Sequence, residues 1–68
     1  MIGLGAIVRD KETEFQGIVT ARSEYLYDAP KVLVENIDTT GRPIEVWYNE
    51  ERVYEIDDEE YELEGISN

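Results

Sequence analysis

Apolar and polar residues alternate with a period of two along most of the chain, which is the spacing of side chains on the two faces of a β-strand. The pattern is strongest over residues 15–22. It predicts two faces for this strand: Gly17, Val19 and Ala21 on one, and Ile18, Thr20 and Arg22 on the other. Because glycine has no side chain, we expect Gly17 to allow a close crossing or a sharp bend inside a small barrel, with a simple bulge or turn as the alternative.

Runs of β-branched and alternating residues predict four further strands. These are residues 4–9, 31–37, 44–48 and 53–56. The connections are a polar loop over residues 10–14, a long link over 23–30, a turn cluster over 38–43 and one tight turn of 3₁₀ type over 49–52. In the first strand, Leu4, Ala6 and Val8 are expected to share one face.

Short strands joined by turns, with no helical periodicity before residue 57, predict an all-β fold in the form of a small antiparallel barrel. Closure of the barrel is expected to remove exposed sheet edges. A chain of 68 residues makes one domain at most, so we assign residues 1–56 to the barrel and 57–68 to an acidic tail. We expect the tail to be flexible; one or two turns of helix capped by Gly65 is the alternative.

The charge of the chain is strongly negative and unevenly distributed. The chain has 17 acidic and 6 basic residues, for a net charge of -11, and residues 55–68 hold seven acidic residues and no basic one. Without a basic stripe, the chain is expected to bind neither nucleic acid directly nor an anionic membrane. The expected partner is a protein with a basic surface.

The residue types disfavour catalysis and cofactor binding. The chain has no histidine and no cysteine, so no histidine base is present to activate Ser23 or Ser67, and no thiolate is present to bind zinc. The acidic run 57–60 lacks the alternating spacing that wraps one cation, and we expect a solvated run rather than a metal site. We therefore expect a soluble, non-enzymatic protein without a metal or cofactor.

The aromatic residues are the stronger functional signal. If Ile44, Val46 and Tyr48 point inward, Trp47 points outward and is available for docking, whereas the alternative is that it caps an open barrel end. Tyr25 and Tyr27 lie in the long link, where we expect Tyr25 to cover the edge of the core. The candidate partner-binding residues are Tyr25, Tyr27, Trp47 and Tyr54. Phe15 is assigned to the core, and Arg22 to an internal ion pair next to Glu24.

Two resemblances support a barrel. The order of Gly5 to Val8, then Phe15 to Val19, then a hydrophobic strand, then Trp47-Tyr48 before a polar turn resembles SH3-like small barrels of the KOW and Tudor kind. The run Gly17-Ile18-Val19-Thr20-Ala21-Arg22-x-Glu24-Tyr25-Leu26 is similar to short phage and prophage proteins of uncharacterised function. The resemblance covers roughly residues 3–56. It implies a phage origin and an SH3-like barrel, without an assigned activity, although this chain has Tyr27-Asp28 where the group often has Gly-Cys.

Three roles are consistent with these features. The first is a phage-encoded module that docks on a host or phage protein through its aromatic residues, while acidic residues steer it towards a basic surface. The second is a DNA mimic that inhibits a nucleic-acid-binding host protein, and the third is a minor virion protein. The candidate steering or mimicking carboxylates are Glu50, Glu51, Asp57, Asp58, Glu59, Glu60, Glu62 and Glu64, joined for the mimic by Glu12 and Glu14. These roles place the protein in the host cytoplasm or the virion, and self-association through Trp47 is a further alternative.

Overall fold

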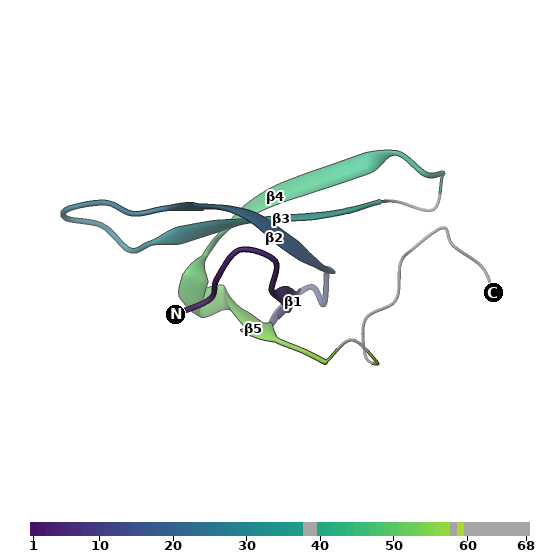
Figure 1. The fold of residues 1–68 in the computed structure, drawn as a ribbon, viewed down its shortest axis with the longest axis horizontal. Coiled ribbons are helices and arrows are strands. Elements are labelled where there is room, and N and C mark those ends of the chain that lie inside the picture. Colours follow the sequence, from purple (N-terminus) through teal and green to yellow (C-terminus); the bar gives the residue numbers. More distant parts are fainter. Residues whose placement is uncertain (38–39, 58, 60–68) are drawn as a thin grey trace.

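Five antiparallel strands form one coiled sheet in the order β4-β3-β2-β1-β5 (Figure 1). The computed structural model of the protein describes residues 1–37, 40–57 and 59. The strands in that part of the chain are β1 Ile7–Asp10, β2 Gln16–Ser23, β3 Lys31–Ile37, β4 Pro43–Asn49 and β5 Val53–Glu55, and the 3₁₀ helix η1 Glu50–Arg52 joins β4 to β5. The predicted all-β fold of about five short antiparallel strands is confirmed, and the coiled sheet is consistent with a small barrel-like fold.

The core is built almost entirely from valine. Among the described residues, the buried hydrophobic side chains are those of Val8, Val19, Val32, Val34, Val53 and Tyr48. Each fully buried valine contributes about 2 kcal/mol of hydrophobic stabilisation, and its β-branched side chain suits the pleated surface of a strand. Phe15 packs against this cluster as predicted, and its ring centroid lies 6.4 Å from that of Tyr48.

Gly17 lies where the backbone of β3 comes closest to β2. A Cβ atom at this position would be 2.2 Å from the carbonyl oxygen of Glu35 and 3.0 Å from Cγ1 of Val34. Gly17 also pairs with Val8 of β1, so β2 lies between β1 and β3 at this point. The predicted close approach of another strand at Gly17 is therefore confirmed.

A β-bulge at Thr20 reverses the two faces of β2, and the predicted positions of Ala21 and Arg22 are wrong. Val19 pairs with Val34, but Ala21 pairs with Leu33, so Thr20 is an extra residue in the ladder. Because paired residues share a face, Ala21 lies on the outer face with Leu33, and Arg22 lies on the inner face. The uninterrupted alternation of residues 15–22 concealed this bulge.

The first strand begins and ends later than predicted. Leu4 precedes β1 and is 68% exposed, so it does not share the core face of Val8. Asp10, which was assigned to the polar loop, is the last residue of β1 and is 1% exposed. The core face of β1 is therefore made by Val8 and Asp10.

The sheet stays open between β4 and β5, so the expected removal of exposed edges does not occur in the described part of the chain. These strands stand at opposite ends of the strand order. The single turn of η1 between them directs β5 onto β1, where Tyr54 pairs with Arg9, rather than onto β4. Both edge strands consequently have one side that no other strand in this sheet covers. The predicted nature of the tail falls largely outside the described residues.

Candidate functional site

The link between β2 and β3 presents three consecutive apolar side chains to solvent. Tyr25 is 50% exposed, Leu26 is 85% exposed and Tyr27 is 95% exposed. The link forms one extreme end of the molecule, at the left of Figure 1, beyond the ends of both strands. Tyr25 does not belong to the core cluster or to the residues packed against it, so the prediction that it covers the core edge is wrong.

Trp47 lies on the outer face of β4, as the alternation predicts. Val46 and Tyr48 belong to or pack against the core, while Trp47 between them is 49% exposed. Its partner on β3 is Leu33, whose own partner on β2 is Ala21. The bulge therefore creates an apolar row across three strands that ends in the indole ring.

Lys31 connects the exposed link to the tryptophan. Its ammonium nitrogen lies 5.8 Å from the centroid of the Tyr25 ring, which is within cation–π range. Lys31 pairs with Asn49 on β4, two residues from Trp47 on the same face. We name this set the aromatic surface; it consists of Tyr25, Leu26, Tyr27, Lys31 and Trp47.

The fourth aromatic candidate belongs to a different region of the sheet. Tyr54 is 41% exposed on β5, which stands at the opposite end of the strand order from β4. It pairs with Arg9 of β1. Three of the four predicted aromatic residues thus lie on the aromatic surface and one does not.

A groove of about 640 Å³ lies beside Trp47. Its walls come from the loop after β1, from β3 and β4, and from η1. The lining residues are Lys11, Glu12, Lys31, Trp47, Tyr48, Asn49, Glu51 and Arg52. Three of the chain's six basic residues line this one groove, although the protein as a whole is strongly acidic.

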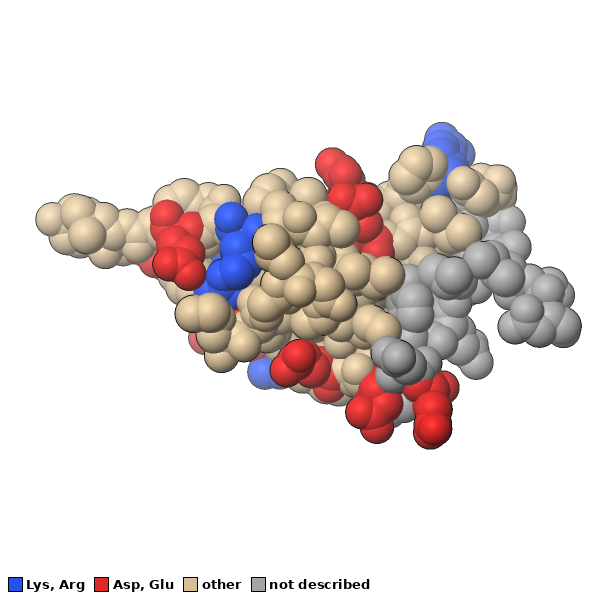
Figure 2. All heavy atoms as spheres, viewed as in Figure 1, with Lys and Arg blue, Asp and Glu red and all other residues tan. Residues whose placement is uncertain are grey.

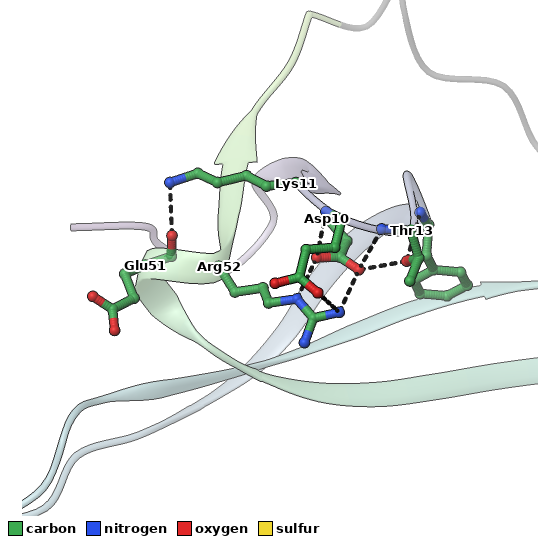
Figure 3. Close-up of polar contacts among 7 residues, drawn as sticks. Asp10, Lys11, Thr13, Glu51 and Arg52 are labelled. Carbon is green, nitrogen blue, oxygen red and sulfur yellow. Dashed lines mark hydrogen bonds and ion pairs between the residues drawn. The ribbon is translucent and has the colours of Figure 1, made fainter.

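One wall of the groove is fixed by the buried carboxylate of Asp10 (Figure 3). The guanidinium of Arg52 donates to it from Nε at 2.7 Å and from Nη2 at 3.1 Å. The hydroxyl and backbone N–H of Thr13 and the backbone N–H of Glu12 complete its hydrogen bonds. The hydrogen bonds from Arg52 hold the pKa of Asp10 well below its usual range, against the opposing effect of burial.

Lys11 joins the same loop to η1. Its ammonium group donates a hydrogen bond of 2.7 Å to the backbone oxygen of Glu51, as Figure 3 shows. The Arg52 guanidinium lies 5.4 Å from the centre of the Tyr48 ring. The loop, η1 and β4 are therefore held together around the groove.

Glu50, which was predicted to be a steering carboxylate, forms hydrogen bonds within the fold. Arg22 Nη1 donates to Glu50 Oε2 at 2.8 Å, and the backbone N–H of Ile2 donates to the same oxygen. Arg22 also binds the carbonyl oxygen of Ile2 and the carboxylate of Glu24, which confirms the predicted internal ion pair. The hydrogen bond from Arg22, supported by that from Ile2, lowers the pKa of Glu50.

The remaining candidate carboxylates are divided between described and undescribed residues. Glu51, Asp57 and Glu59 are exposed, as are Glu12 and Glu14 in the loop after β1. Asp58, Glu60, Glu62 and Glu64 lie outside the described residues. In Figure 2, the acidic side chains on the visible face form separate groups rather than one continuous row.

Metal and membrane signals were searched over residues 1–37, 40–57 and 59. Within these ranges, no group of three potential metal-ligating side chains is close enough to hold an ion. No helix in this part of the chain is long and apolar enough to cross a membrane. The chemistry of the site therefore comes from aromatic rings, ammonium and guanidinium groups, and carboxylates.

Comparison with known proteins found no matching family model, no matching curated protein and no matching solved structure. The candidate site is therefore defined by its geometry alone. Sequence reasoning located the aromatic residues but not the groove, because its basic residues Lys11, Lys31 and Arg52 are far apart in the chain. Asp10 had a detectable signal, since it continues the alternation of Ala6 and Val8.

Proposed function

We propose that this chain is a small, phage-encoded, non-enzymatic module that docks on a host or phage protein through its aromatic surface. The observation that carries the proposal is the exposure of Tyr25, Leu26 and Tyr27 at one end of the molecule, together with a half-exposed Trp47 on the outer face of β4. Tyrosine and tryptophan are enriched among the residues that dominate binding energy at protein interfaces. Exposed carboxylates would accelerate encounter with a basic partner in the host cytoplasm or the virion.

The physical form of the surface supports docking by contact rather than by charge alone. The link extends beyond both strands and can enter a concavity on a partner, while Lys31 at its base contacts the Tyr25 ring. Tyrosine side chains bring large contact area with few rotatable bonds, so little conformational entropy is lost on binding. Removal of two such anchors is expected to weaken binding by at least about tenfold.

The test compares immobilised full-length protein with two variants in capture from host lysate, read by mass spectrometry and followed by affinity measurement with the purified partner. Tyr25→Ser with Tyr27→Ser should lose the partner. Leu4→Ser is the matched control, because it removes another exposed apolar side chain outside the aromatic surface, and it should retain the partner. A partner that binds the double variant as tightly as the wild type would refute the proposal.

The DNA-mimic role makes a different prediction about salt. A mimic would bind a nucleic-acid-binding protein through its carboxylates, and that complex should dissociate steeply as salt rises. Docking through the aromatic surface should survive moderate salt and be insensitive to Glu62→Gln with Glu64→Gln. The separation of the acidic groups in Figure 2 and the internal use of Glu50 favour docking.

A further inference from the structure

We infer that the open edge of β4 accepts an added antiparallel strand from the protein partner, and that this strand carries a lysine or arginine two positions after an apolar residue. The inference rests on the proposed function, because it describes the partner segment that would meet Trp47. β4 is an end strand of the sheet with β3 on one side (Figure 1), and its seven residues exceed the three of β5, the other edge strand. Strand addition to such an edge is a recurring mode of peptide recognition.

The hydrogen bonding between β3 and β4 determines which backbone groups point to the open edge. Lys31 pairs with Asn49, and the backbone N–H of Glu50 donates to the carbonyl oxygen of Pro30 at 3.0 Å. Hydrogen-bonded and non-hydrogen-bonded pairs alternate in an antiparallel ladder, so Lys31 and Asn49 form a non-hydrogen-bonded pair. The backbone N–H and C=O of Asn49 therefore point away from β3.

The same orientation recurs at every second residue of β4, because the register with β3 contains no shift. Glu45 and Trp47 therefore present their N–H and C=O groups to the open edge. Within residues 1–37, 40–57 and 59, no hydrogen bond to these four groups is found. Pro43 is in the same phase and has no N–H, as expected for proline in an edge strand. An incoming strand can thus exchange two hydrogen bonds with Glu45 and two with Trp47.

Two carboxylates stand opposite each other beside this edge. Glu35 and Glu45 form a cross-strand pair at a non-hydrogen-bonded position, where the side chains are closest. Glu35 accepts a hydrogen bond of 2.6 Å from Thr20 Oγ1, but no ion pair among the described residues involves either glutamate. Like charges directly opposite each other destabilise a sheet, so a cation placed across from Glu45 would relieve the repulsion.

The outer face of β4 specifies the residue types of the added strand. Glu45 and Trp47 are exposed there, two positions apart. In antiparallel pairing, the residue opposite Trp47 precedes the residue opposite Glu45 by two positions. An apolar side chain opposite Trp47 extends the apolar row that ends at the indole, and a lysine or arginine opposite Glu45 meets the two carboxylates. The residue between them lies opposite Val46, which packs against the core, so it should also be apolar.

A second copy of this chain fits the edge less well than a basic segment of another protein. β4 contains no basic residue, so pairing with its copy would bring no cation to Glu45. Each copy also has a net charge of -11, and two such chains repel each other. The same charge attracts a basic segment, which favours this occupant.

The test uses synthetic peptides and the full-length protein, in which Trp47 is the only tryptophan and serves as the reporter. The parent peptide is acetyl-Ser-Thr-Val-Val-Lys-Thr-Ser-amide, whose first valine would lie opposite Trp47 and whose lysine would lie opposite Glu45. Fluorescence titration measures the affinity, and amide chemical shifts in NMR spectra locate the site. We expect Trp47 to emit at shorter wavelength, Glu45 and Trp47 to show the largest amide shifts, and the dissociation constant to lie below about 1 mM.

Methylation of single backbone nitrogens in the peptide tests the added strand directly. The N–H of the first valine would face β4, whereas that of the second valine would face away. N-methylation of the first valine should therefore weaken binding about tenfold. The matched control carries the same methyl group on the second valine and should bind within about twofold of the parent. Equal effects of the two methyl groups would overturn strand addition.

Charge substitutions test the basic residue. Replacement of the peptide lysine by glutamate, or Glu45→Gln in the protein, should weaken binding by about threefold or more. Glu14→Gln is the matched control, because it removes the same charge from an exposed position in the loop after β1 and should leave the affinity unchanged. A glutamate peptide that binds as tightly as the parent would overturn the choice of a basic strand.

Absence of binding at about 1 mM peptide, or amide shifts confined to the link over residues 23–30, would also overturn the inference. Concentration-dependent shifts at Glu45 and Trp47 without peptide, together with a larger particle mass, would overturn it in favour of a second copy. The peptides need no contact with Tyr25 or Tyr27, so their failure leaves docking through the link intact. If the tyrosine variants retained a partner while the peptides bound as predicted, the proposed function would fail and the added strand would stand.

Discussion

Arg52 and Asp10 are separated by 42 positions in the sequence, yet the guanidinium of Arg52 donates two hydrogen bonds to the buried carboxylate of Asp10. The Asp10 carboxylate also accepts from the loop that follows β1. One side chain therefore links the end of β1, the following loop and η1. The loop and η1 both line the groove.

Loss of Arg52 should destabilise the fold strongly. Arg52→Ala leaves the Asp10 carboxylate buried without its cation, and removing one partner of a buried pair is expected to cost about 3 kcal/mol. Lys11→Ala is the control, because it removes one exposed hydrogen bond and should cost under about 1 kcal/mol. Urea unfolding followed by circular dichroism measures both. A loss below about 1 kcal/mol for Arg52→Ala would show that the pair does not stabilise the sheet.

Stability should fall as the pH is lowered into the acidic range. Asp10 and Glu50 both have a folded-state pKa below their usual values, so the unfolded chain binds protons at pH values where the folded chain does not. The stabilisation is complete above the unfolded-state pKa values and is lost as the pH falls through the lower folded-state values. The free energy of unfolding should therefore decrease from about pH 5 towards pH 2.

The pH profile of a variant identifies the groups responsible. Asp10→Asn should be less stable than the wild type at neutral pH and should show a shallower acid dependence. Exposed carboxylates provide the comparison, since Glu14→Gln should leave the slope unchanged. An acid profile that is identical in the wild type and in Asp10→Asn would assign the acid sensitivity to other groups.

Gly17 should not tolerate any side chain. A methyl group would lie 2.2 Å from a backbone oxygen of β3, which cannot move without disrupting the ladder. Gly17→Ala is therefore expected to cost more than about 3 kcal/mol or to prevent folding. Gly3→Ala is a matched control, because its added methyl group would meet no atom within 4 Å. Thermal unfolding of the two variants compares them, and similar midpoints would contradict the close approach of β3.

Glu14 offers a route to greater stability. Its backbone has φ 66°, a left-handed conformation that favours glycine. Glu14→Gly relieves a backbone strain of about 1–2 kcal/mol. The greater conformational entropy of glycine in the unfolded chain offsets part of this effect. We therefore expect the free energy of unfolding to rise by about 0.5–1 kcal/mol. Glu12→Gly, two positions earlier in the same loop, relieves no strain; it carries the entropic cost of glycine and removes an exposed ion pair with Arg52. The denaturant midpoint should rise for Glu14→Gly and fall for Glu12→Gly.

Much of the fold could be predicted because strand periodicity is a local signal. The bounds of β3 agree with the prediction at both ends, and the outward direction of Trp47 follows from the inward direction of Val46 and Tyr48. The turn of η1 was also anticipated. In each case, neighbouring residues contain the information.

The missed features depend on contacts between distant segments. Asp10 is polar, so composition assigns it to a loop, and its burial makes sense only when Arg52 is placed beside it. The bulge at Thr20 is set by pairing with β3, and nothing in the run of small residues indicates it. The groove combines residues from positions 11, 31 and 52, whose proximity arises from the strand order.

The bulge at Thr20 divides β2 into two reading frames. Residues 16–19 follow one inside–outside phase and residues 21–23 follow the opposite one. Deletion of Thr20 would restore a regular ladder but would turn Ala21 inward and Arg22 outward, which would separate the guanidinium from Glu50 and Ile2. Grafts and chimeras of this strand must therefore keep the length of the segment as well as its sequence, since one residue more or fewer exchanges the side chains on the inner and outer faces of the sheet.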